Sequence, residues 1–273
     1  MATKLFFALQ LDLPYALPLP SGRYLLRDPQ GEPELVVVIG PAASTTTLTA
    51  IEPTPLADAG EGERRLAGVE GEAALAALQP QLAKVFQGLR LATGTLLYPP
   101  AAAALAGLRA GYGSGEQLAA GELARAKELG GERRGPLRRL FQGRRRTALP
   151  AEERLAAVLS GRLPPLLCEE LALRARLALG AGEVALAAFE LGGALRFALR
   201  ELEAEVAVVG GNLGERLVEL HSLAQALSEG EDGRPTPPRE ELERGLQRLE
   251  AALRLRALVR SGSYKRRSDG ADG

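Results

Sequence analysis

The hydrophobic pattern of this chain changes once, and that change limits the folds available to it. Residues 4–52 contain short apolar and β-branched runs, among them KLFFALQL, GRYLLRD, ELVVVIG and STTTLTAI. From residue 61 onward, apolar residues recur at three- and four-residue steps, which is the spacing of one face of an α-helix. The sequence therefore predicts an α+β protein, with a small N-terminal β-sheet part followed by a predominantly α-helical C-terminal domain.

The N-terminal part predicts three or four strands. GRYLLRD and ELVVVIG surround the turn-forming segment PQGEP, an arrangement typical of a β-hairpin. Residues 35–39 are continuously apolar instead of alternating, so we expect this strand to be buried on both faces. The segment EPTPLADAGEGE then ends the β-rich region with Pro and Gly.

The later pattern predicts helices and a division of the chain. Pro80 interrupts a helical pattern and is expected to separate or kink two helices. Residues 168–204 predict two helices around a turn at 180–182. We expect a mixed α/β domain over 1–130, an Arg-rich linker over 131–149, a helical domain over 150–260 and a flexible tail over 261–273.

Charge and cysteine content exclude several classes of protein. The 34 basic and 34 acidic residues give a formal net charge of zero, whereas a domain that lives on nucleic acid is usually basic throughout. Cys168 is the single cysteine, so no intramolecular disulfide can form, and we expect a cytoplasmic protein. One Cys and one His cannot make a Cys/His zinc site within one chain. No Lys is followed by Ser or Thr, which excludes a Walker-type phosphate loop. We predict no metal and no cofactor.

No motif predicts a catalytic residue. Cys168, His221 and Asn212 are the only residues of their types and could imitate a Cys–His–Asn set. The two glutamates that follow Cys168 would raise the pKa of its thiol. We therefore interpret Cys168 as a small buried hydrophobe and His221 as a helix-packing or surface residue.

Carboxylates leave one enzymatic alternative open. Glu pairs on facing helices can hold metal ions, so an enzyme with a carboxylate-only site is possible in principle. We interpret Glu190, Glu201 and Glu205 as solvated helix positions. A non-enzymatic protein is therefore the favoured class.

The stretch GYGSGEQ, residues 111–117, has two interpretations. Its alternating Gly111, Gly113 and Gly115, together with Ser114, could form a backbone nest for an anion ahead of a helix. The spacing is not that of a dinucleotide-binding loop, and alternating glycines in a turn need no ligand. A structural turn is the favoured interpretation.

The longest uncharged run, LATGTLLYPPAAAALAGL over residues 91–108, has the minimum length of a membrane-spanning helix. Pro99 and Pro100 lie in its middle, and proline breaks the hydrogen-bond ladder of a helix. We expect two buried segments around a turn instead of a membrane-spanning helix, and a membrane is not the favoured partner.

The strongest local feature is RRGPLRRLFQGRRR, residues 133–146, which has seven arginines and no acid. Such a segment can neutralise phosphates, rest on an anionic membrane surface or dock on an acidic partner. It can equally be a solvated linker, or can dock on acidic areas of its own chain. Its candidate polyanion- or partner-binding residues are Arg133, Arg134, Arg138, Arg139, Arg144, Arg145 and Arg146.

Several of these stretches resemble a family of uncharacterised bacterial proteins from high-GC genomes. The resemblance rests on GRYLLRD, GYGSGEQ, the arginine run leading to ERLAAVL, and CEELALRARLAL at 168–179. It covers most of the chain to about residue 204. It implies no activity or ligand, and no functional residue is carried over from it.

The leading hypothesis is a non-enzymatic protein-interaction or scaffold protein that acts through helical surfaces, with a protein partner or a homo-oligomer. A nucleic-acid-binding protein that uses residues 133–146 is the first alternative. An enzyme with a carboxylate-only site is the second.

Overall fold

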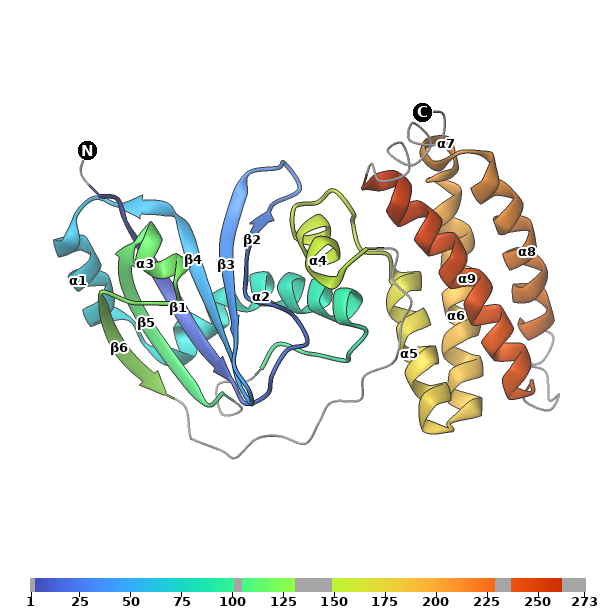
Figure 1. Ribbon diagram of the computed structural model, residues 1–273, viewed down its shortest axis with the longest axis horizontal. Coiled ribbons are helices and arrows are strands. Elements are labelled where there is room, and N and C mark those ends of the chain that lie inside the picture. Colours follow the sequence, from blue (N-terminus) through green and yellow to red (C-terminus); the bar gives the residue numbers. More distant parts are fainter. Residues whose placement is uncertain (1–2, 101–104, 131–148, 229–236, 262–273) are drawn as a thin grey trace, which may run out of the picture. The chain divides into compact units, whose positions relative to one another are not determined.

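The computed structural model describes residues 3–100, 105–130, 149–228 and 237–261, which form two compact units (Figure 1). The sheet unit takes its described residues from 1–89, 97–130 and 158–161, and the helical unit from 90–96, 149–157 and 162–261. The boundaries differ from the predicted domains 1–130 and 150–260, because residues 90–96 belong to the helical unit and 158–161 to the sheet unit. The predicted linker and tail lie almost entirely outside the described residues.

The sheet unit is built on a six-stranded antiparallel sheet with the strand order β2-β3-β4-β1-β5-β6. The strands are β1 (Leu5–Leu13), β2 (Gly22–Arg27), β3 (Pro33–Pro41), β4 (Thr46–Leu56), β5 (Gly107–Ser114) and β6 (Arg125–Gly130). The first four fall in the region where the sequence predicts three or four strands. The sheet followed by helices confirms the α+β class.

The predicted hairpin is formed by β2 and β3. Tyr24 pairs with Val37, which places the turn at residues 28–32. The Asp28 carboxylate accepts hydrogen bonds from the backbone N–H groups of Gln30 and Glu32 at 2.9 and 2.8 Å. Gly31 adopts a φ of 90°, a conformation that favours glycine. Leu35 and residues 37–39 of β3 are buried, whereas Val36 is half-buried, so the predicted burial on both faces holds for four of the five residues.

Helices cover the two faces of the sheet unequally. Helix α1 (Ala59–Gly68) packs through Leu66 on the face that carries Phe7 and Tyr112. Helix α3 (Gly115–Ala119) is much shorter and packs through Leu118 on the opposite face. In Figure 1 the long helix α2 (Gly71–Thr93) lies behind the sheet, whereas α3 lies in front of it.

Strand β1 shows how the sequence assigns side chains to these faces. Successive strand residues point to opposite faces, so Phe7, Leu9 and Leu11 face one side. Ala8 and Gln10 face the side of α3. Because α3 is short, part of this second face is left without a covering helix, and the polar residues of the sheet gather there.

The helical unit is an Ala- and Leu-rich bundle. Its elements are α4 (Ala151–Leu159, of which residues 158–159 belong to the sheet unit), α5 (Leu167–Ala181), α6 (Val184–Glu203), α7 (Val206–Val209), α8 (Gly211–Ser228) and α9 (Arg239–Arg260). The predicted turn between α5 and α6 is confirmed, with Gly182 at a φ of 82° closing α5. Helix α6 contacts α5, α8 and α9, and α9 crosses in front of it in Figure 1.

Two sequence expectations about helices have clear outcomes. Pro80 lies inside the single helix α2 instead of separating two helices. The structure tolerates it because a proline removes only one backbone hydrogen bond from a helix of this length. No helix among the described residues has the length and apolar character needed to cross a membrane.

Candidate functional site

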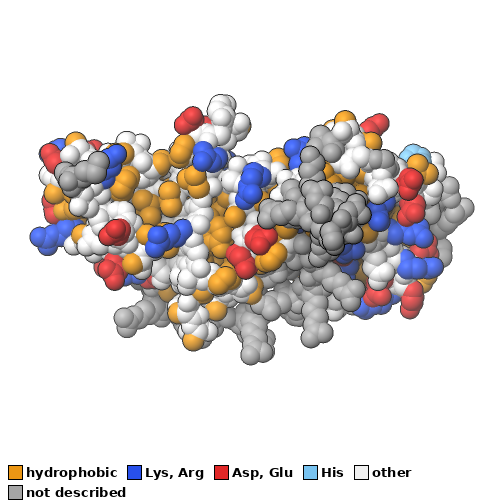
Figure 2. All heavy atoms as spheres, turned by 45° about the horizontal axis from the view of Figure 1, so that its top comes forward, with side chains coloured by type: hydrophobic (Ala, Val, Ile, Leu, Met, Phe, Trp, Pro, Cys, Tyr) orange, Lys and Arg blue, Asp and Glu red, His pale blue; other side chains and the backbone are white. Residues whose placement is uncertain are grey.

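The predicted Arg-rich binding segment lies outside the described residues. Its seven arginines belong to residues 131–148, so its role stays a prediction. At the right of Figure 2, both acidic and basic side chains are visible on the helical unit.

The candidate ligand loop GYGSGEQ forms the end of a strand and the start of a helix. Gly111, Gly113 and Ser114 belong to β5, and Gly115 opens α3. The Ser114 hydroxyl accepts from the backbone N–H of Gln117 at 3.2 Å, and the Gln117 side chain accepts from the backbone N–H of Ser114 at 3.0 Å. This reciprocal cap satisfies the backbone N–H groups of Ser114 and Gln117.

Close packing explains the glycine at position 111. A Cβ there would lie 2.3 Å from the backbone oxygen of Arg125 on β6. This distance is too short for any side chain, so only glycine fits at position 111 without a shift of the backbone. The neighbouring Tyr112 donates a hydrogen bond to Glu63 at 2.7 Å, and this bond raises the pKa of its phenol. The stretch therefore has structural reasons for its composition, and anion binding by it stays a prediction.

The only thiol is buried in the helical unit. Cys168 has no exposed surface, which confirms its interpretation as a buried residue. Burial, together with the Glu201 carboxylate and the charge of Glu169, raises the pKa of the thiol. A thiol held in its protonated form is a poor nucleophile, so the geometry gives Cys168 no catalytic role.

Two glutamates expected to be solvated have internal partners instead. Glu201 of α6 accepts hydrogen bonds from the backbone N–H groups of Leu167 and Cys168, at 2.9 and 3.0 Å, and so caps α5. Glu205 is 7% exposed and binds Arg256 and Arg260. The solvated interpretation is wrong for both, because their cationic or N–H partners come from other helices and leave no trace in the local sequence.

Burial and charge act in opposite directions on Glu205. Burial alone would raise its pKa, but the hydrogen bond from Arg260 and the charges of Arg256 and Arg260 outweigh it and hold the pKa below its ordinary value. A second pair, Arg154 and Glu169, is joined at 2.9 Å with both side chains almost fully buried. Among the described residues no group of three His, Cys, Asp or Glu side chains is arranged to hold a metal ion.

The outer face of α6 exposes large apolar side chains. Leu186, Phe189 and Phe197 are 46%, 66% and 38% exposed. An α-helix turns by about 100° per residue, so these three residues and Gly193 fall on one face of α6. We call this face the α6 stripe. Its edges differ in charge, with Glu183 and Glu190 along one edge and Arg196 along the other. Arg200 falls on the same face, one turn beyond Phe197.

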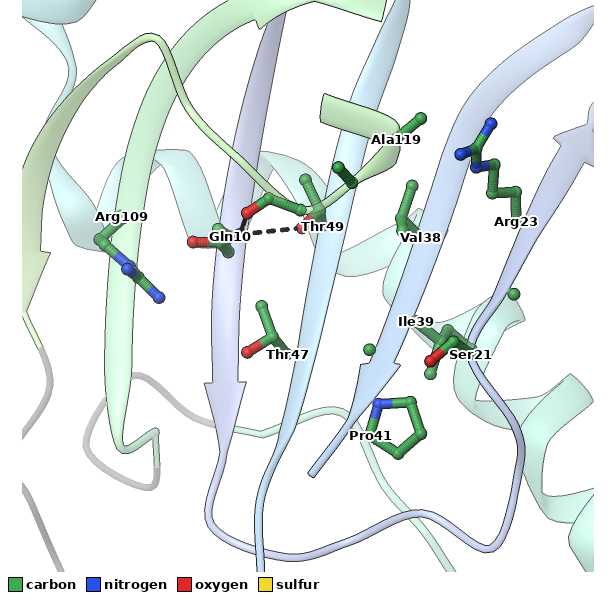
Figure 3. Close-up of a pocket in the computed structure, with 14 residues that line it drawn as sticks. Gln10, Ser21, Arg23, Val38, Ile39, Pro41, Thr47, Thr49, Arg109 and Ala119 are labelled. Atoms are coloured by element: carbon green, nitrogen blue, oxygen red, sulfur yellow. Dashed lines mark hydrogen bonds between the residues drawn. The ribbon is translucent and has the colours of Figure 1, made fainter. Parts of the chain in front are cut away.

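The uncovered part of the sheet carries an open pocket of about 620 Å³ (Figure 3). Its floor is one row of residues that the strand register brings side by side. Arg23 pairs with Val38, Val38 with Thr49, Thr49 with Gln10, and Gln10 with Arg109. Figure 3 shows the two arginines at opposite sides of the pocket, with the other three residues between them.

Sequence reasoning missed both the pocket and the α6 stripe. The floor residues come from five strands, and β5, which carries Arg109, was not predicted as a strand of the sheet. The apolar positions of α6 were visible in the sequence, but which of them face the core depends on where α5, α8 and α9 pack.

Comparison with known proteins adds no relative. A scan against protein-family models, a search of curated proteins and a search of solved structures each found no match.

Proposed function

We propose that this chain is a non-enzymatic interaction protein that self-associates through the α6 stripe. The observation that carries the proposal is the exposure of Phe189, at 66%, in line with Leu186 and Phe197 on a helix whose other sides are covered. Burying one such side chain contributes about 1.5–3 kcal/mol. Aromatic side chains of this kind are common anchors of protein interfaces.

The glycine in the stripe supports a helix as the occupant. Gly193 lies between the two phenylalanines, and within the described part of the chain only the Leu171 side chain of α5 comes within 4 Å of where its Cβ would be, at 3.5 Å. A helix position without a side chain lets a second helix approach closely. The phenylalanines on either side then define the ends of the contact.

The charged edges support a second copy of the chain as that helix. In a dimer whose two-fold axis runs parallel to α6, the acidic edge of one stripe faces the basic edge of the other. Arg196 of the second copy then lies on the same side as Glu190 but six residues, about 9 Å, further along the helix axis. This diagonal pairing of two long side chains occurs twice, as in every isologous interface. An antiparallel pair would bring the two acidic edges together, so the charges favour the parallel arrangement.

Such a dimer would act as a scaffold that holds two sheet units and two copies of the segment 131–148 in one assembly. A cytoplasmic setting fits this role, since the single buried cysteine needs no oxidising compartment. Nothing in this function requires a cofactor.

Sedimentation velocity of the full chain over a range of concentrations tests the proposal. The wild type should form dimers, and Phe189→Glu should raise the dimer dissociation constant at least about tenfold, the effect of losing an interface hot spot. Val218→Glu is the matched control, because Val218 of α8 is 69% exposed but lies outside the α6 stripe.

A charge swap tests the arrangement of the two copies. Glu190→Arg should weaken the dimer, and the double variant Glu190→Arg with Arg196→Glu should restore it. A wild type that stays monomeric at about 100 μM, well above the range of specific dimers, would refute self-association. Equal weakening by Val218→Glu would refute the α6 stripe as its site.

A further inference from the structure

We infer that the open pocket on the α3 face of the sheet binds a small hydroxylated molecule that carries one anionic group, of the class of sugar phosphates and sugar acids. This inference concerns the sheet unit and goes beyond the proposed dimer. Pockets of roughly 300–1,000 Å³ are typical of small-molecule sites, and the volume of about 620 Å³ falls in this range.

The orientation of Gln10 gives the pocket its first recognition element. Gln10 is 3% exposed, and its Nε2 donates to the carbonyl oxygen of Gly121 at 2.8 Å and to the Thr49 hydroxyl at 3.1 Å. A carbonyl oxygen can only accept, so this bond decides which end of the amide is nitrogen. The Gln10 Oε1 accepts no hydrogen bond from any residue that the structure describes and is left to accept from a ligand.

Thr49 supplies the complementary donor. Its oxygen accepts from Gln10, and its own proton is donated to no other residue in the described part of the chain. Gln10 and Thr49 are both held rigidly in the sheet and are adjacent across two paired strands. An acceptor next to a donor matches a hydroxyl group, or a pair of neighbouring hydroxyls, because each hydroxyl both donates and accepts.

The charges of the pocket call for one anionic group. Arg109 is already paired with Asp12 at 2.7 Å and lies 4.0 Å from Glu128. Asp12 also accepts from the Thr47 hydroxyl at 2.8 Å, so this side of the pocket is internally compensated. Arg23 is exposed on the edge strand β2 and has no carboxylate partner among the described residues.

The spacing of these groups sets the size of the ligand. Arg23 and Thr49 are two strands apart in the same row, which corresponds to roughly 10 Å between their Cα atoms. The guanidinium can reach inward over Val38, so an anion and a hydroxyl on one small carbon skeleton satisfy both ends. No aromatic side chain is among the residues that line the pocket, so a nucleotide base would find no ring to stack on.

Isothermal titration calorimetry on the full chain tests the inference with four probes: glucose 6-phosphate, gluconate, glucose and inorganic phosphate. At least one of the two hydroxylated anions, glucose 6-phosphate or gluconate, should bind at least about tenfold more tightly than glucose or inorganic phosphate. Glucose lacks the anionic group, and inorganic phosphate lacks the hydroxylated carbon skeleton. The two charged probes also distinguish a phosphorylated sugar from a sugar acid.

Variants assign the binding to the pocket. Arg23→Gln should weaken it about tenfold, the effect of losing one charge-assisted hydrogen bond. The matched control Arg64→Gln changes an exposed arginine on α1, at the opposite face of the sheet, and should leave the affinity unchanged. Thr49→Val should weaken binding, and Thr49→Ser, which keeps the hydroxyl, should restore it.

Three results would overturn the inference. No saturable binding of either charged probe at about 10 mM, a concentration above the weakest specific affinities, would refute the site. Equal affinity for glucose and glucose 6-phosphate, with gluconate no tighter, would refute the role of Arg23. An affinity unchanged by both Arg23→Gln and Thr49→Val would place the binding elsewhere.

Discussion

Replacing Glu205 by Gln should destabilise the helical unit more than breaking an exposed ion pair would. The Glu205 carboxylate lies 3.2 Å from the Nε of Arg256 and 2.8 Å from the Nε of Arg260. Arg256 has no exposed surface. The other carboxylate near it among the described residues is Glu169, at 4.0 Å, which already binds Arg154 at 2.9 Å. The substitution thus leaves Arg154 and Arg256 to share Glu169 as their one buried carboxylate.

Breaking a buried ion pair by removing one partner costs about 3–5 kcal/mol, because the other charge stays buried and uncompensated. Gln keeps the shape of Glu205 and can still accept a hydrogen bond, and Arg260 is partly exposed. We therefore expect a loss of about 3 kcal/mol in the free energy of unfolding at pH 7, the low end of that range.

The loss should depend on pH with a definite sign. The folded protein lowers the pKa of Glu205, so the ionised form stabilises the fold fully above the pKa of the unfolded chain, about 4.3. This contribution disappears as the pH falls through the lower pKa of the folded state. Below that pH the wild type carries a neutral Glu205, and its stability should approach that of the variant.

Urea denaturation followed by circular dichroism at 222 nm, at pH 7 and at about pH 3, measures both effects. Cys168 provides a second readout specific to the helical unit, since this buried single thiol reacts with a disulfide reagent only when that unit opens. Glu243→Gln is the matched control on α9. Its pair with Arg239 is exposed, so its loss should cost less than about 0.5 kcal/mol.

A loss below about 1 kcal/mol at pH 7, the range of exposed pairs, would refute the argument that Arg256 depends on Glu205. A loss of the same size at both pH values would refute the electrostatic origin of the effect. Packing alone would then account for it.

Two further predictions follow from the sheet unit and from the arginine run. Gly111→Ala should destabilise the protein by about 2 kcal/mol in thermal unfolding, since overpacking at the β5–β6 contact costs about 1–3 kcal/mol. Gly180→Ala in the last turn of α5, where a Cβ meets no atom within 4 Å, should be neutral or slightly stabilising, and equal effects of the two changes would contradict the packing argument. Changing residues 144–146 to Gln should weaken the binding of fluorescent DNA and RNA oligonucleotides, measured by anisotropy at physiological salt, if the arginine run contacts phosphates; binding that is absent, or seen only at low salt and unchanged in the variant, would remove nucleic acid as a partner of this run.

The parts of the fold that the sequence predicts are those with strong local determinants. The β2–β3 hairpin has β-rich runs around a turn, and the α5–α6 hairpin has helical spacing around Gly182. Strands β5 and β6 have no such determinants. Their sequences, GLRAGYGS and RAKELG, are rich in Gly, Ala and charged residues, which have low strand propensity. Pairing with β1, and not propensity, makes β5 a strand.

The candidate sites could not be predicted from the sequence for a related reason. Gln10 and Arg109 are neighbours only because β1 and β5 pair in one particular register. A shift of one residue would turn Gln10 to the other face of the sheet. In the same way, Glu205 has the sequence context of a solvated residue and becomes buried only because α9 brings Arg256 to it.

The position of α9 in the bundle illustrates how such pairs select one packing among several. The core between α5, α6 and α9 consists of Leu and Ala, whose shapes repeat along each helix. A slide of α9 by one turn, about 5.4 Å, would exchange one set of Leu and Ala contacts for a similar set. The same slide would separate Glu250 from Arg176, which it binds through two hydrogen bonds of 2.7 and 2.8 Å, and Arg256 from Glu205.

Glu250 and Arg256, which are both buried, would stay buried without their partners, at a cost of several kcal/mol. A slide moves every residue of α9 by the same distance, so only the observed register keeps both pairs. Burial of the apolar core thus stabilises the packing of α9 on the bundle, and the buried ion pairs determine the register of α9. The two roles are separable, since replacing Leu by Met in this core should change stability without changing the helix register.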